Sequence, residues 1–104
     1  MTICFVSGDT WEFDVELLQA DGSPYELAEG DQVWFNVKHS YQDGKCLIAI
    51  KQESTHFKIQ PPLTDLAATQ YQFDIGIIFS NGDIYTAIPE GMLIIKNRVC
   101  CDGD

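Results

Sequence analysis

The sequence predicts an all-β fold, an antiparallel β-sandwich of about 7–9 short strands. Two patterns indicate this fold: turn-forming residues recur at intervals of roughly ten residues, and the runs between them alternate apolar and polar side chains. The chain has 104 residues, of which 45% are hydrophobic, the size of one domain with a single core. We therefore expect one domain over residues 1–98, followed by a short acidic tail at 99–104. The turn signals are Gly8-Asp9, Asp21-Gly22-Ser23-Pro24, Glu29-Gly30-Asp31, Asp43-Gly44, Pro61-Pro62, Asn81-Gly82 and Pro89-Glu90-Gly91.

The first half of the chain predicts four strands. From residue 11 the apolar side chains fall on one face and acidic side chains on the other, as in a strand between core and solvent. Residues 33–38 alternate in the same way, a run at 47–50 follows the turn at Asp43-Gly44, and a short strand at 57–59 ends at Pro61-Pro62. The inward set is Trp11, Phe13, Val15, Leu17, Val33, Phe35, Val37, Phe57 and Ile59.

The longest strand is predicted from residue 71 to residue 79. Its apolar face carries Tyr71, Phe73, Ile75, Ile77 and Phe79. Asn81-Gly82 then predicts a hairpin with a type I′ turn, because both residues tolerate positive φ. The returning strand is expected over 84–88, and a last strand over 92–95 closes the sheet.

Only residues 63–70 interrupt this rhythm. Thr64 is a helix-capping residue followed by good helix formers, which predicts a single helical turn near residues 64–69. A turn before a strand that begins with Tyr71 is typical of the tyrosine corner of immunoglobulin-like domains, in which the phenolic hydroxyl bonds back to nearby backbone. Phe73 then stands where antibody domains have a cysteine, so we expect an apolar ring in place of the inter-sheet disulfide.

The net charge excludes two classes of partner. Six basic against 16 acidic side chains give a charge of −10 at pH 7, which repels phosphate backbones and anionic membranes. No apolar run approaches the ~20 residues of a membrane span. The start of the chain lacks a basic region and its apolar run stops at Ser7, so we expect cytoplasmic synthesis without Sec export. No nucleic-acid or membrane partner is expected.

Cysteines and histidines lack the spacing of a metal site. No C-x-x-C or H-x-x-x-H element is present, so we expect no metal, no cofactor and reduced thiols. The adjacent Cys100 and Cys101 allow soft-metal or redox chemistry, although a frayed acidic terminus is the favoured interpretation. The set is Cys4, His39, Cys46, His56, Cys100 and Cys101.

Catalysis has little support in the sequence. No serine or cysteine sits in a nucleophile motif. The acidic pairs Glu12/Asp14 and Asp14/Glu16 share a strand face, as glycosidase carboxylates could, but a solvated strand face explains them more simply. We therefore expect a protein that is not an enzyme.

Large side chains on the outward faces are the candidates for binding. Alternation places Trp34, Ile78 and Tyr85 there, with Ile48 and Ile50 as further candidates. If they cluster, they form an apolar patch for a protein or a saccharide. The alternative is that loops such as residues 19–31 cover them.

The order of short motifs resembles a group of small phage and prophage proteins from Gram-positive and gut bacteria. These are similar in turn to the N-terminal immunoglobulin-like domain of the phage baseplate upper protein. The resemblance spans residues 8–95. It rests on Gly8-Asp9-Thr10 leading into 11–15, on Asp21-Gly22-Ser23-Pro24-Tyr25-Glu26-Leu27, Gly30-Asp31, Val33-Trp34-Phe35-Asn36-Val37-Lys38, Thr64-Asp65-Leu66, Tyr71-Gln72-Phe73-Asp74-Ile75, Asn81-Gly82-Asp83-Ile84-Tyr85-Thr86 and Ile88-Pro89.

This resemblance implies a non-catalytic structural or docking module of a virion, in its tail or baseplate. The partners would be other virion proteins or further copies of the chain, and the protein would move from the bacterial cytoplasm into the virion. The sequence departs from the pattern after residue 97, where a longer family member would continue toward a receptor-binding region. A carbohydrate-binding or adhesin module that uses Trp34 and Tyr85 is the alternative function.

Overall fold

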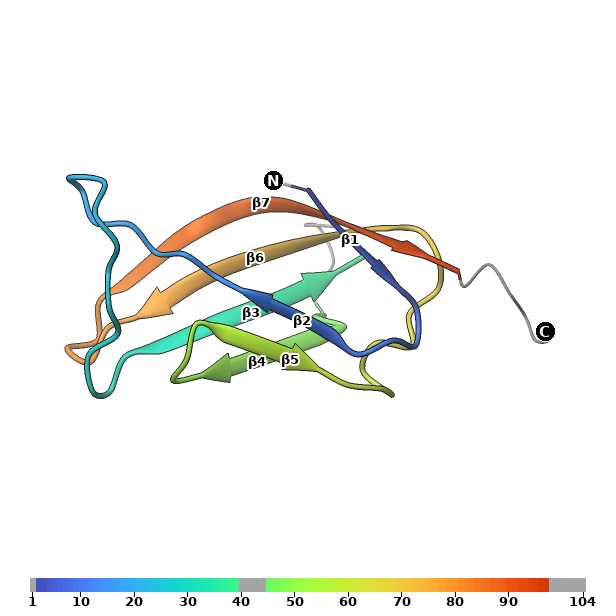
Figure 1. Ribbon diagram of the computed structural model, residues 1–104, viewed down its shortest axis with the longest axis horizontal. Coiled ribbons are helices and arrows are strands. Elements are labelled where there is room, and N and C mark those ends of the chain that lie inside the picture. Colours follow the sequence, from blue (N-terminus) through green and yellow to red (C-terminus); the bar gives the residue numbers. More distant parts are fainter. Residues whose placement is uncertain (1, 40–44, 98–104) are drawn as a thin grey trace.

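The computed structural model describes residues 2–39 and 45–97, and in these residues it is all-β. The described residues form strands and turns without a helix, and Figure 1 shows their arrangement. The acidic tail expected at 99–104, with Cys100 and Cys101, lies outside the described residues. The strands are β1 (Thr2–Val6), β2 (Trp11–Asp14), β3 (Gln32–Lys38), β4 (Ile48–Gln52), β5 (His56–Ile59), β6 (Gln70–Ile78) and β7 (Ile84–Lys96).

The strands form two layers. The larger sheet has the order β1-β7-β6-β3-β4, and the smaller sheet pairs β2 with β5. In Figure 1 the small sheet lies in front of the large one. Every pairing is antiparallel except that of β1 with β7, which is parallel. The run β7-β6-β3-β4 opposite β2-β5 follows the G-F-C-C′ and B-E order of immunoglobulin variable-type sandwiches, so the predicted fold class is confirmed.

Two strand predictions needed correction. β1 was not expected, and it is held at the edge by its parallel pairing and by Trp11, whose indole N–H donates to the Val6 carbonyl at 2.9 Å. The strands expected at 84–88 and 92–95 are one continuous strand, β7. Its register against β6 shifts between Phe73 and Gly76, so bulges absorb the irregularity around Pro89 without ending the strand.

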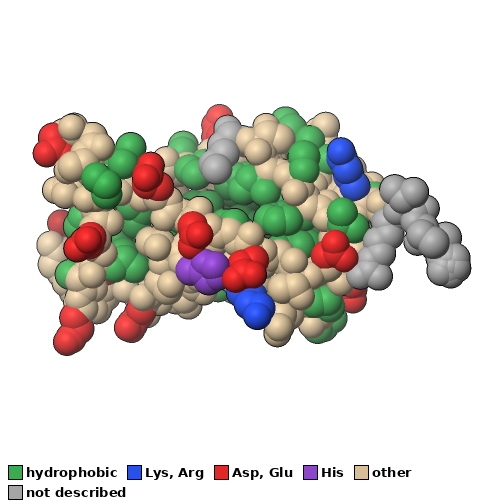
Figure 2. Space-filling model, in the orientation of Figure 1, with side chains coloured by type: hydrophobic (Ala, Val, Ile, Leu, Met, Phe, Trp, Pro, Cys, Tyr) green, Lys and Arg blue, Asp and Glu red, His purple; other side chains and the backbone are tan. Residues whose placement is uncertain are grey.

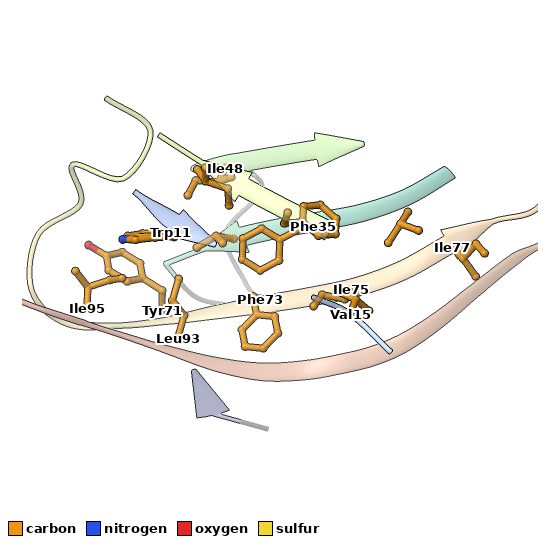
Figure 3. Packing of buried hydrophobic residues seen from close by; sticks show 14 of the residues in the cluster. Trp11, Val15, Phe35, Ile48, Tyr71, Phe73, Ile75, Ile77, Leu93 and Ile95 are labelled. Atoms are coloured by element: carbon orange, nitrogen blue, oxygen red, sulfur yellow. The ribbon is translucent and has the colours of Figure 1, made fainter. Parts of the chain in front are cut away.

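The core between the layers is built on aromatic rings. Phe73 is 1% exposed, and its ring lies 5.7 Å from Phe35. Phe35 in turn lies 5.1 Å from Phe13 and 5.9 Å from Phe57 in the small sheet. Figure 3 shows Phe73 and Phe35 pointing into this layer. Phe73 is therefore a buried core residue between the two layers, as the alternation predicted.

The segment before β6 forms the predicted tyrosine corner but not the predicted helical turn. The Tyr71 hydroxyl donates to the Ala67 carbonyl at 2.8 Å. Residues 61–64 form a turn and 65–69 are irregular. The carbonyl of Thr64 accepts from the amides of Gly8 and Leu66, at 3.0 and 2.9 Å, so it is not free to begin a helix. The buried Thr64 hydroxyl, the expected cap, has no hydrogen-bond partner among the described residues.

The hairpin at Asn81-Gly82 is present with a different turn. The Phe79 amide donates to the Asp83 carbonyl and the Gly82 amide donates to the Phe79 carbonyl, both at 2.8 Å. These bonds enclose the three residues 80–82, with Gly82 at φ 94°. The side chain of Asn81 accepts from the Asp83 amide at 2.9 Å, which stabilises this longer loop instead of the two-residue type I′ turn.

Candidate functional site

The three predicted interface residues do not form one patch. Trp34 and Ile78 lie on the outer face of the five-stranded sheet, because their neighbours Phe35 and Ile77 point into the core. Tyr85 pairs with Ile77 and therefore faces the inner side. Its side chain is nevertheless 56% exposed, since β7 begins beyond the end of the small sheet (Figure 1). The structure thus separates Tyr85 from the other two.

Trp34 is the wall of a hollow on the outer sheet face, called here the Trp34 hollow. Its indole N–H donates to Oδ1 of Asp74 at 2.9 Å. The ring lies over Gly76, where a Cβ atom would come within 2.2 Å of it. A glycine directly across the strand pair therefore makes room for the indole, and Asp74 fixes its orientation. The hollow has a volume of about 440 Å³ and is lined by Trp34, Asn36, Cys46, Ala49, Ile50, Lys51 and Ile78.

The Trp34 hollow combines apolar walls with a polar rim. Ile78 extends the apolar surface beside the indole, while Asn36 and Lys51 offer hydrogen-bonding groups. Ile50, also considered as an outward residue, pairs with the inward-facing Phe35 and packs against the core, so it only borders the hollow. Ile48, considered as an outward residue in the sequence, is instead fully buried in the core, because it pairs with the inward-facing Val37. Such a hollow can take an apolar side chain of a protein or the face of a sugar ring.

A second hollow, called here the loop-end pocket, lies where the β2–β3 connection meets the β6–β7 hairpin. Its volume is about 380 Å³. The sequence patterns did not predict this pocket, because they indicated only that residues 19–31 could cover a sheet face. Leu17-Leu18 was the available signal, since two consecutive leucines break the alternation and send one side chain outward. The lining residues are Leu17, Leu18, Gln19, Ala20, Tyr25, Ile77, Phe79 and Tyr85.

The buried carboxylate of Asp31 holds Tyr25, one of the residues that line the loop-end pocket, in place. Asp31 is 2% exposed and accepts hydrogen bonds from the Tyr25 hydroxyl at 2.5 Å and from the amides of Ala28 and Ser80, each at 2.9 Å. These bonds hold the pKa of Asp31 below its usual range and raise the pKa of Tyr25. Asp31 thereby ties the β2–β3 connection to the hairpin and holds the Tyr25 ring edge-on against Phe79 at 5.7 Å.

The acidic face of β2 is engaged with a histidine. Nδ1 of His56 lies 2.7 Å from Asp14 and Nε2 lies 2.7 Å from Glu12, all three side chains being solvent-exposed. The hydrogen bonds of Asp14 and Glu12 raise the pKa of His56. Neither carboxylate lines the Trp34 hollow or the loop-end pocket.

The contacts of His56 with Asp14 and Glu12 predict a pH-dependent contribution to stability. A raised pKa in the folded state means that the contribution is fully present below the unfolded histidine pKa, about 6.5, and is lost as pH rises through the folded value. We expect NMR titration of the His56 ring to give a pKa above that of the same ring in the Glu12→Gln/Asp14→Asn variant. Identical titration curves would show that the two carboxylates do not act on His56 in solution.

Other groups of metal-ligand type do not converge in the part of the chain that is described. No cluster of three or more His, Cys, Asp or Glu side chains arranged to hold a metal ion occurs in residues 2–39 and 45–97. Cys4 is an exposed and Cys46 a half-buried free thiol. The same residues contain no helix long and apolar enough to cross a membrane.

Comparison with protein-family models and with curated proteins gave no match.

Proposed function

We propose that this domain is a non-catalytic docking module that assembles with other proteins, in the manner implied by its resemblance to phage tail and baseplate sandwiches. The observation that supports this proposal best is the Trp34 hollow. The resemblance implies that the assembly is a virion, and the Trp34 hollow is the surface that would contact the neighbouring protein.

The position of Trp34 favours a protein contact. Tryptophan is enriched among the residues that dominate binding energy at protein interfaces, especially where it is held in place before binding. Here Asp74 and Gly76 hold the indole, so little conformational freedom remains to be lost when a partner docks. Ile84 pairs with Ile78 and is exposed, which extends the apolar surface beyond the hollow. The partner would be another virion subunit or a further copy of this chain.

Assembly into particles tests the proposal. Phage particles from a strain that encodes the protein are quantified by mass spectrometry, with wild-type protein and with the variants Trp34→Ala and Ala49→Arg. We expect a stoichiometric copy number for the wild type and a loss of at least about thirtyfold for both variants, the size of an interface hot spot. Leu63→Ala, an exposed change on the β5–β6 connection, should assemble normally.

Ala49→Arg separates binding from folding. Ala49 is exposed and lines the hollow, so an arginine there fills the hollow without disturbing the core. Absence of the wild-type protein from purified particles would overturn the virion role. Normal assembly of Ala49→Arg would instead move the contact away from the Trp34 hollow.

A saccharide-binding module is the second candidate, favoured by the polar groups around the indole. An aromatic face flanked by Asn36 and Lys51 offers stacking and hydrogen bonds to one sugar ring. Titration of glycans should then change the fluorescence of Trp34, whereas Trp11 is buried and should not respond. A uniformly blank glycan array with wild-type protein would eliminate this candidate.

A further inference from the structure

The loop-end pocket is separate from the Trp34 hollow. The two share no lining residue. Ile77, at the floor of the pocket, faces the inner side of the large sheet, whereas Ile78 faces the hollow on the outer side. Occupation of one site therefore does not block the other.

The pocket is open and mostly apolar. Leu18 is 54% exposed and Tyr85 is 56% exposed, although both are large hydrophobic side chains. The hydroxyl of Tyr25 is already bound to Asp31, so it is not free to recognise a polar ligand. A volume of about 380 Å³ is enough for one large apolar side chain, but the lining offers little hydrogen bonding for a sugar.

The charge around the pocket has one sign. Residues 2–37 and 59–95, which supply every lining residue, contain no lysine or arginine. Exposed carboxylates lie beside the lining: Glu16 precedes Leu17, Asp21 follows Ala20, and Glu26 follows Tyr25. Figure 2 shows red side chains around exposed green ones at this end of the molecule, with the visible blue side chains elsewhere. An apolar side chain that enters here passes through a negative field.

We propose that the loop-end pocket binds a basic segment of a partner protein, which inserts one large apolar side chain between Leu18 and Tyr85. Lysine or arginine residues on both sides of that anchor would lie against Glu16, Asp21 and Glu26. The charge complementarity selects the partner and speeds its association, while the buried anchor supplies most of the affinity. The tie between Asp31 and Ser80 keeps the two walls in place before binding.

A heptapeptide with tryptophan between two runs of three lysines, acetylated and amidated at its ends, serves as the probe. It is titrated into the ¹⁵N-labelled protein, and amide shifts are followed by NMR. We expect shifts concentrated in residues 17–25 and 77–85. Replacing the central tryptophan by glycine should weaken binding at least roughly tenfold. Raising the salt concentration from about 20 to 300 mM should separately weaken binding of the tryptophan peptide.

A matched pair of variants assigns the binding to the pocket. Leu18→Ser should weaken binding of the tryptophan peptide at least roughly tenfold. Leu63→Ser removes a leucine that is 50% exposed on the β5–β6 connection and should leave the affinity unchanged. Both changes are on the surface, so both variants should fold. Trp34→Ala should also bind normally, because this inference does not depend on the Trp34 hollow.

Four outcomes would overturn the proposal. One is equal binding of the tryptophan and glycine peptides, which would mean attraction by charge alone. Another is equal loss in the two leucine variants, and the third is the absence of shifts at millimolar peptide. The last is equal affinity for a peptide that has glutamates in place of the lysines. That result would show that the pocket does not select a basic partner and binds only the apolar side chain.

Discussion

Replacing Phe73 with alanine is expected to lower the free energy of unfolding by about 3–5 kcal/mol, the usual cost of removing a fully buried phenylalanine. The ring contacts Phe35, which in turn contacts Phe13 and Phe57 of the small sheet, so its loss opens a cavity between the layers. For a domain of this size the melting temperature should fall by roughly 15 °C or more. Urea unfolding with an unchanged m value is the measurement.

A double-mutant cycle with Gly91 tests the geometry of this packing. A Cβ atom at Gly91 would lie 2.2 Å from the Phe73 ring, so Gly91→Ala should be destabilising on its own by about 1–3 kcal/mol. In the Phe73→Ala background the same methyl group enters the cavity, and its cost should largely disappear. Additive effects of the two changes would mean that the ring does not lie against Gly91.

The core residues and the tyrosine corner could be predicted because neighbouring residues in the sequence determine both. The alternation through Phe73 fixes which side chains face inward, and a one-residue shift of register would expose them all. Tyr71 was predicted to form a tyrosine corner from its place after a turn, and its hydroxyl bond to Ala67 confirms this. Neither prediction needed knowledge of distant residues.

The wrong predictions concern local structures that are determined by residues far away in the sequence. The helical turn fails because the Gly8 amide, more than fifty positions earlier in the chain, occupies the carbonyl of Thr64. β1 was missed because its partner β7 lies far along the chain, and a parallel pair of strands is not joined by a hairpin turn that the sequence could show.

The candidate sites were predicted only in part, for the same reason. Alternation correctly placed Trp34 and Ile78 on the outer face, but it cannot show that Gly76 gives the indole its place. Tyr85 faces inward by register and is exposed only because the small sheet ends before it. The loop-end pocket depends on two segments about sixty residues apart that Asp31 brings together, so no sequence window contains it.

Asp31→Ala is expected to lower the melting temperature by on the order of 10 °C, because it leaves three donors without their acceptor. These are the hydroxyl of Tyr25 and the amides of Ala28 and Ser80. Without them the β2–β3 connection is no longer tied to the hairpin, so the affinity of the loop-end pocket for the tryptophan peptide should fall as well. Asp31 does not line the pocket, so it would act on binding by positioning Tyr25 and by tying the β2–β3 connection to Ser80 of the hairpin.

The pH dependence separates this carboxylate from its neighbours. Because the pKa of Asp31 is lowered in the folded state, its contribution is present above the unfolded value, about 3.9, and is lost as pH falls through the folded value. The wild type should therefore lose more stability on acidification than Asp31→Ala does. Asp31→Asn keeps one acceptor oxygen and should recover part of the melting temperature at neutral pH without restoring the acid dependence.

Asp21→Ala is the matched control for this prediction. Asp21 lies in the same connection and accepts two hydrogen bonds from Ser23, but it is exposed and ties only its own turn. We expect that variant to melt within about 2–3 °C of the wild type, as exposed substitutions usually do. If thermal melts followed by circular dichroism showed equal losses for Asp31→Ala and Asp21→Ala, the bond from Ser80 to Asp31 would not be what holds the connection against the hairpin. The walls of the loop-end pocket would then have to be held by apolar packing alone, through the contact between Tyr25 and Phe79.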